Sequence, residues 1–112
     1  MNVYEDMQQI LKDRGRCTTT MTKHDGSTCL VGASYLATGE DFNFMFYNET
    51  KYYEDTPQTD KLAKIIREQF PDSPFLNPFD TKSHVICYTF NDGHSDEDVM
   101  LILQKAAADE LS

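Results

Sequence analysis

The stretch Ser95-Asp-Glu-Asp-Val-Met-Leu-Ile-Leu-Gln-Lys-Ala-Ala-Ala-Asp-Glu-Leu111 decides the fold class. Ser95, followed by Asp98 three residues later, resembles a capping box, and the acids between them favour the positive end of a helix dipole. The apolar residues that follow are too many for one narrow stripe. We therefore expect a helix over about 95–111 that is either central in the fold or contacts a partner.

Two more amphipathic helices are expected on either side of the middle of the chain. Apolar residues recur at helical spacing over 3–14, and Gly15 is well placed to end that helix because glycine adopts positive φ without steric cost. A second helix is expected from Asp60, as its N-cap, to Phe70, where Pro71 terminates it.

The remaining segments are shorter and mix helical and strand signals. We expect a small β-hairpin in which residues 17–22 are a β-branched strand and residues 23–26 a turn with an Asp-Gly pair. Residues 29–37 suit a buried helix or a returning strand, and we favour the helix. Residues 42–46 alternate aromatic and other side chains with period two, which predicts a strand. Residues 81–90 carry signals of both kinds, and we favour a helix.

The predicted fold is α+β and predominantly helical, with about four helices and a small β-hairpin or short strands. The chain of 112 residues predicts a single domain over 1–112, and 39% hydrophobic residues predict a packed core. Three cysteines match no disulfide scaffold, which predicts reduced, mostly buried thiols. The N-terminal residues resemble neither a secretory signal nor a transit peptide, so we expect a cytoplasmic protein.

The formal net charge of −9 disfavours direct binding to nucleic acid or to an anionic membrane. It suits a protein partner with a basic surface. Acids concentrate between Glu40 and Asp60, where six acidic residues accompany Lys51 alone. A net charge of this size also favours solubility. The sequence is compatible with either a monomer or a homo-oligomer.

Three blocks of sequence resemble a family of small uncharacterised phage and bacterial proteins, a domain of unknown function marked by Trp-Asn-Asp near the C-terminus. The blocks are the opening helix ending in Asp13-Arg14-Gly15, the run Cys29-Leu30-Val31-Gly32-Ala33, and Phe90-Asn91-Asp92 followed by Gly93-His94-Ser95. They cover about half of the chain, with Phe90 in place of the Trp and a shorter turn after Asp92. The resemblance implies a mostly helical fold and a phage or phage-derived origin, with no activity to carry over.

One polar cluster contains residue types that can ligate zinc or pair a nucleophile with a base. Its members are His84, Cys87, Asp92 and His94. Their spacing matches no regular metal site, and we favour a structural interpretation in which Asn91 and Asp92 bond to the backbone of a tight turn, Gly93 reverses the chain and Ser95 caps the last helix. We assign no catalytic residue, no metal and no cofactor.

The aromatic segment after Gly39 is the better candidate for function, because aromatic residues among acids are typical of interface cores and rims. The candidate interaction residues are Phe42, Phe44, Tyr47, Tyr52, Tyr53, Glu54 and Asp55. The sequence leaves open whether these aromatics fill the core or form an interface. The leading hypothesis is a phage-type accessory protein that binds a host protein. The alternatives are an acidic DNA mimic that inhibits a nucleic-acid-binding protein, and a metal protein or enzyme that uses His84, Cys87, Asp92 and His94.

Overall fold

The chain folds into helices joined by irregular loops. The computed structural model describes residues 2–111, and within them it has six α-helices and one 3₁₀ helix. These are α1 (Val3–Arg14), α2 (Leu30–Ala37), α3 (Phe42–Tyr47), η1 (Glu49–Tyr52), α4 (Pro57–Gln69), α5 (Ser83–Gly93) and α6 (Asp96–Leu111).

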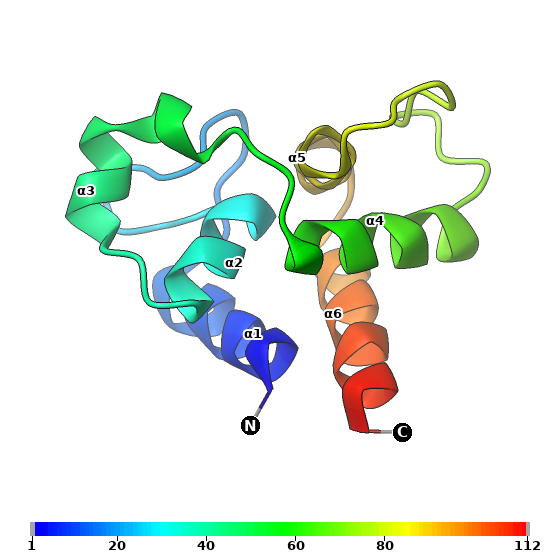
Figure 1. Cartoon of the computed structure of the whole chain (residues 1–112), viewed down its shortest axis with the longest axis horizontal. Helices are drawn as coiled ribbons and strands as arrows, with labels where there is room; N and C mark the ends of the chain where they lie inside the picture. The colour runs from blue at the N-terminus through cyan, green and yellow to red at the C-terminus, as the bar shows by residue number, and fades with distance from the viewer. Residues whose placement is uncertain (1, 112) are drawn as a thin grey trace.

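Helix α6 is the central packing element. Helices α1 and α2 pack together, α4 and α5 pack together, and α6 contacts both α1 and α4 (Figure 1). Five residues of α6 are buried, namely Val99, Ile102, Leu103, Ala106 and Ala107. The start of α1 lies beside the end of α6, where the Asn2 side chain donates to the Ala107 carbonyl at 3.1 Å. The sequence predicted that this helix is either central in the fold or contacts a partner, and the structure places it at the centre.

The long helices begin and end at recognisable capping residues. The predicted helix over 3–14 is confirmed, and Gly15 follows it with φ +85°. Helix α4 begins earlier than the predicted Asp60: the Thr56 side chain accepts the Thr59 amide at 3.1 Å, and Pro57 occupies the first helical position. Proline suits that position because its missing N–H has no helical partner there.

The predicted β-hairpin is wrong. Residues 2–111 contain no β-strand, and the loop between α1 and α2 has only two isolated bridges, which join Thr28 to Arg16 and to Thr22. The loop keeps a few backbone bonds, such as that from the Cys29 amide to the Met21 carbonyl, but the Thr19 amide donates to the Asp92 side chain at 3.0 Å and the Met21 amide to that of Glu49 at 2.6 Å. Groups bonded in this way are not available for a ladder between strands.

The predicted strand over 42–46 is also wrong, because this segment forms helix α3. The favoured helices over 29–37 and 81–90 are borne out by α2 and α5. The fold is therefore mostly helical, with more helices than expected and no sheet in the described residues.

The core is one cluster of buried side chains drawn mainly from α1, α2, α4, α5 and α6, with Met45 of α3, Tyr52 of η1 and residues of the loops. The three cysteines, Cys17, Cys29 and Cys87, are buried within it as free thiols. Among the described residues, no helix has the length and apolar character that crossing a membrane requires.

Candidate functional site

Helix α3 exposes two of its four aromatic side chains. The Asp41 side chain caps it by accepting the Phe44 amide at 2.9 Å, and Met45 is its one buried residue. Phe44 is 47% exposed and Tyr47 is 77% exposed. The helix therefore contributes one side chain to the core and presents Phe44 and Tyr47 outward.

We define the aromatic surface of α3 as Phe42, Phe44, Phe46 and Tyr47, of which Phe44 and Tyr47 are exposed and Phe42 and Phe46 are half-buried. The Phe42 and Phe46 rings stack with centroids 6.5 Å apart, and the Tyr47 ring meets Phe46 edge-on at 5.1 Å. Tyr52, expected as a contact residue, is instead buried beneath this surface, 6.3 Å from the Phe44 ring, and its hydroxyl donates to Glu40.

Cations of the chain itself already lie over two rings of the aromatic surface. The Arg14 guanidinium lies 4.6 Å from the Phe42 centroid, and the Lys51 ammonium lies 5.3 Å from the Phe44 centroid. Exposed acids Glu40 and Asp41 precede the helix directly. Ring faces carry partial negative charge, so both the rings and the acids favour positively charged neighbours.

The three remaining candidates, Tyr53, Glu54 and Asp55, follow η1. Tyr53 is 43% exposed and its ring lies 6.3 Å from that of Tyr88. Asp55 accepts two hydrogen bonds from His84, from its amide at 3.0 Å and from its ring Nδ1 at 2.6 Å. These bonds to the charged form lower the pKa of Asp55 to about 2.

A surface pocket of about 380 Å³ adjoins Tyr53. We call it the tyrosine pocket, and its lining residues are Thr19, Tyr53, His84, Val85 and Tyr88. Glu49 does not line the pocket but is joined to it, because the Tyr88 hydroxyl donates to this carboxylate at 3.3 Å. Burial, together with nearby groups that include Glu49, raises the pKa of Tyr88 far above its ordinary range.

The structure separates the four residues of the polar cluster. Cys87 is fully buried against the Thr59 carbonyl, and burial raises the pKa of its thiol. His84 pairs with Asp55, and Asp92 accepts the Thr19 amide. Among residues 2–111, no three His, Cys, Asp or Glu side chains lie so that they could hold a metal ion.

Of the residues expected to form a turn and a cap, Asn91 and Asp92 connect more distant segments, whereas Ser95 acts locally. Asn91 is fully buried, where its side chain accepts the Leu30 amide at 3.1 Å and donates to the Cys17 carbonyl at 2.9 Å. Ser95 accepts the Asp98 amide at 3.2 Å, in the position of a cap for α6. Gly93 ends α5 in close contact with Phe75, whose ring would lie 2.3 Å from a Cβ at position 93.

His94 lies in a hydrogen-bonded chain with the order of a Ser–His–Asp triad. Its Nε2 is 2.7 Å from the Ser73 hydroxyl, and its Nδ1 is 2.9 Å from the Asp98 carboxylate. The Phe75 amide also donates to the Ser73 oxygen, and the Phe75 ring lies against His94 with centroids 5.5 Å apart. Because the His94 ring is packed against Phe70, Phe75 and Phe90, we interpret the chain of hydrogen bonds as a structural link between the α4–α5 loop and α6.

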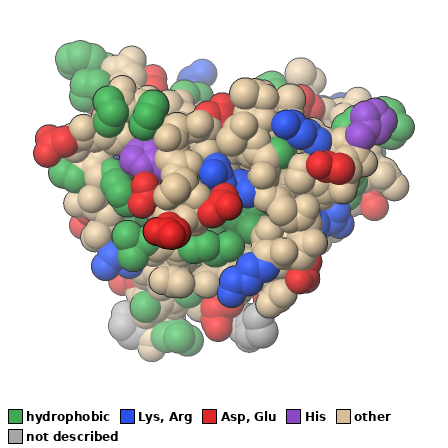
Figure 2. Space-filling model, turned by 180° about the vertical axis from the view of Figure 1, so that it is seen from behind, with side chains coloured by type: hydrophobic (Ala, Val, Ile, Leu, Met, Phe, Trp, Pro, Cys, Tyr) green, Lys and Arg blue, Asp and Glu red, His purple; other side chains and the backbone are tan. Residues whose placement is uncertain are grey.

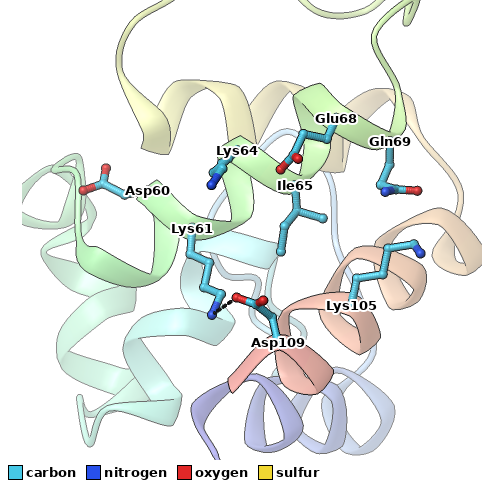
Figure 3. Close-up of a pocket in the computed structure, with 8 residues that line it drawn as sticks. All are labelled: Asp60, Lys61, Lys64, Ile65, Glu68, Gln69, Lys105 and Asp109. Carbon is cyan, nitrogen blue, oxygen red and sulfur yellow. Dashed lines mark ion pairs between the residues drawn. The ribbon is translucent and has the colours of Figure 1, made fainter. Parts of the chain in front are cut away.

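A further pocket of about 540 Å³ lies between α4 and α6 (Figure 3). Lysines and acids alternate on its walls, and Lys61 points to Asp109, with 2.7 Å between its nitrogen and the Asp109 carboxylate. The other charged lining residues are Asp60, Lys64, Glu68 and Lys105. The opposite charges compensate one another, so this pocket does not select a ligand of either sign.

Sequence reasoning missed the residues that hold these sites in place. The Arg16 guanidinium donates to the Asn91 and His94 carbonyls and pairs with Asp96, and Glu49 joins Met21 to Tyr88. Each contact crosses at least 28 positions of sequence. Local periodicity carries no signal of such pairs.

Comparison with known proteins places the chain in a family. Residues 1–109 match the model of a family of unknown function, DUF6197. The chain therefore belongs to this family. Neither the curated proteins nor the solved structures contain a significant match.

Proposed function

We propose that this member of DUF6197 acts by binding another protein, which presents a basic surface to the aromatic surface of α3. The observation that carries the proposal is the exposure of Phe44 and Tyr47, at 47% and 77%, on a helix that buries only Met45. Large aromatic side chains exposed together are costly in water, and aromatic residues dominate the binding energy of interfaces.

Charge supports a basic partner. The chain carries −9 overall, and the exposed acids Glu40, Asp41 and Glu54 lie close in sequence to α3 and η1. On the face seen in Figure 2, Lys and Arg side chains lie among the acids over the middle of the molecule. Complementary charge raises the association rate and excludes acidic competitors.

We also propose that the protein is of phage or phage-derived origin, that the partner is a host protein and that they meet in the cytoplasm. The three sequence blocks quoted above support the origin. Three buried, unpaired cysteines suit a reducing compartment.

The test is affinity capture from lysate of the host bacterium, with the wild-type chain compared with Tyr47→Ser and with Phe44→Ser/Tyr47→Ser. Tyr47 is the cleaner site because its ring contacts Phe46 alone among the aromatic pairs of the described residues. We expect the captured protein to be lost from the double variant, with at least about ten-fold weaker affinity for the purified pair. Phe79→Ser is the matched control, since Phe79 is 87% exposed on the far α4–α5 loop.

The outcomes separate the alternatives. Equal capture by the wild type and the double variant would show that the aromatic surface is not the interface. Binding that survives the aromatic changes but disappears in 500 mM salt would indicate a DNA mimic, because that mode rests on charge alone. Recovery of a second copy of the chain alone would indicate a homo-oligomer.

A further inference from the structure

We infer that the tyrosine pocket binds an arginine side chain of the partner protein. The inference rests on the proposed function and deepens it, because it names the group that anchors the partner. The pocket of about 380 Å³ is lined by Thr19, Tyr53, His84, Val85 and Tyr88. This is room for one long side chain at a surface, and Tyr53 connects the pocket through η1 to the aromatic surface.

The walls suit a planar cation. Tyr53 and Tyr88 meet edge to face with centroids 6.3 Å apart, and Val85 adds an apolar side chain. A guanidinium group stacks on tyrosine faces and presents its donors in the same plane. Lysine has a compact, strongly hydrated ammonium that gains less from such walls.

The charge behind the walls has the required sign. The Glu49 carboxylate is held by the Met21 amide at 2.6 Å and accepts the Tyr88 hydroxyl at 3.3 Å. None of the five lining residues is Lys or Arg. An incoming guanidinium therefore lies beside the two tyrosine rings, and the Glu49 carboxylate, which is bonded to the Tyr88 hydroxyl but is not a lining residue, attracts it from behind them.

The positive end of α5, which would repel a cation, is already compensated. The N-cap residue Lys82 makes no side-chain cap bond, and Asp55 takes that role by accepting the His84 amide at 3.0 Å. The same carboxylate holds His84 Nδ1 at 2.6 Å and so fixes the ring that forms one wall. Asp55 thus keeps both the helix dipole and the imidazole orientation compatible with a cationic ligand.

The chain itself shows that its aromatic faces take cations. Arg14 lies over Phe42 at 4.6 Å, Lys51 over Phe44 at 5.3 Å and Lys61 over Tyr4 at 5.6 Å. The tyrosine pocket has the same kind of faces together with a carboxylate, and a basic partner has the group that completes it.

The experiment is an NMR titration of the full chain with Nα-acetyl-arginine N-methylamide and with the citrulline analogue, which has the same shape without the charge. We expect saturable shifts at Thr19, Val85 and Tyr88 with arginine, a dissociation constant on the order of millimolar, and at least about ten-fold weaker binding of citrulline. Glu49→Gln keeps an oxygen to accept the Met21 amide and should weaken arginine binding about ten-fold, whereas Glu54→Gln, an exposed acid outside the pocket lining, should not.

Equal binding of arginine and citrulline, or no shift localised to the pocket, would overturn the inference, and the ligand comparison needs no variant to fold. The partner capture distinguishes this failure from failure of the proposed function. If Tyr47→Ser abolishes capture while arginine fails to bind, the aromatic surface stands and the pocket inference falls. If arginine binds while capture is insensitive to Tyr47, the pocket stands and the proposed interface falls.

Discussion

At the scale of the residue, Asn91 shows how one polar side chain fixes the arrangement of three segments. It is fully buried at the end of α5 and satisfies the first amide of α2 and the Cys17 carbonyl of the α1–α2 loop. Arg16 reinforces the same junction by donating to the Asn91 and His94 carbonyls. The side chain bridges segments that no backbone ladder connects.

We predict that Asn91→Ala destabilises the protein by about 3 kcal/mol, because it leaves the Leu30 amide and the Cys17 carbonyl buried without partners. Urea unfolding followed by far-ultraviolet circular dichroism measures the change. Asn43→Ala, on the exposed side of α3, is the control and should change stability by less than about 0.5 kcal/mol. A loss below about 1 kcal/mol for Asn91→Ala would mean that water replaces the side chain.

The sequence singled out Asn91 and Asp92 as structural residues, but it placed their bonds in their own turn. Both side chains instead reach the loop between α1 and α2, more than 60 positions away. Asparagine and aspartate side chains commonly form hydrogen bonds with backbone groups, and the sequence therefore indicates a structural role for these residues. Which groups they satisfy depends on the packing of α5 against α2, which local pattern does not contain.

At the scale of the element, the start of α5 is capped by Asp55, a residue from another part of the chain. This cap makes the stability of the protein depend on pH. Asp55 lowers its own pKa to about 2 by accepting two bonds from His84. Because the folded pKa lies below the ordinary value of about 3.9, the stability it contributes is complete above about pH 4 and is lost as the pH falls toward 2. We predict that Asp55→Asn is less stable than wild type at pH 7 and that the difference disappears near pH 2.

Urea midpoints measured at intervals from pH 7 to pH 2 test this prediction. The carboxyl is 40% exposed, so solvent screening keeps the difference small. Glu54→Gln serves as the control, and its difference from wild type should stay flat over the same interval. A difference for Asp55→Asn that grows on acidification would contradict the assigned sign.

Helices α1, α4 and α6 could be predicted because their apolar periodicity extends over three or more turns. Helix α3 could not. Helix α3 has only six residues, so the spacing of its aromatic residues is compatible with a strand as well as with a helix. The hydrogen bond from the Phe44 amide to the Asp41 side chain, which caps the helix, favours the helix. The hairpin failed for a different reason: the Asp25–Gly26 turn forms, but Glu49 and Asp92 take the amides that a strand would pair.

At the scale of the whole molecule, α6 joins the α1–α2 pair to the α4–α5 pair. Its buried side chains Val99, Ile102 and Leu103 belong to the same core cluster as α1 and α4. The tie between Asn2 and Ala107 and the bond of Arg16 to Asp96 fix both ends of α6 against α1. Helix α3, in contrast, reaches this core through Met45 alone.

This arrangement predicts that the protein unfolds as one cooperative unit and that α3, at its edge, is less stable than the rest. Leu103→Ala should cost about 3 kcal/mol and therefore speed amide exchange in α1 and α4 together, by about 100-fold for amides that exchange through global unfolding. Met45→Ala should speed exchange chiefly in α3, because it detaches a short element while the centre stays packed. Hydrogen exchange followed by mass spectrometry resolves the two patterns. Faster exchange in α1 with α4 unchanged after Leu103→Ala would show that the two pairs unfold separately and that α6 does not couple them.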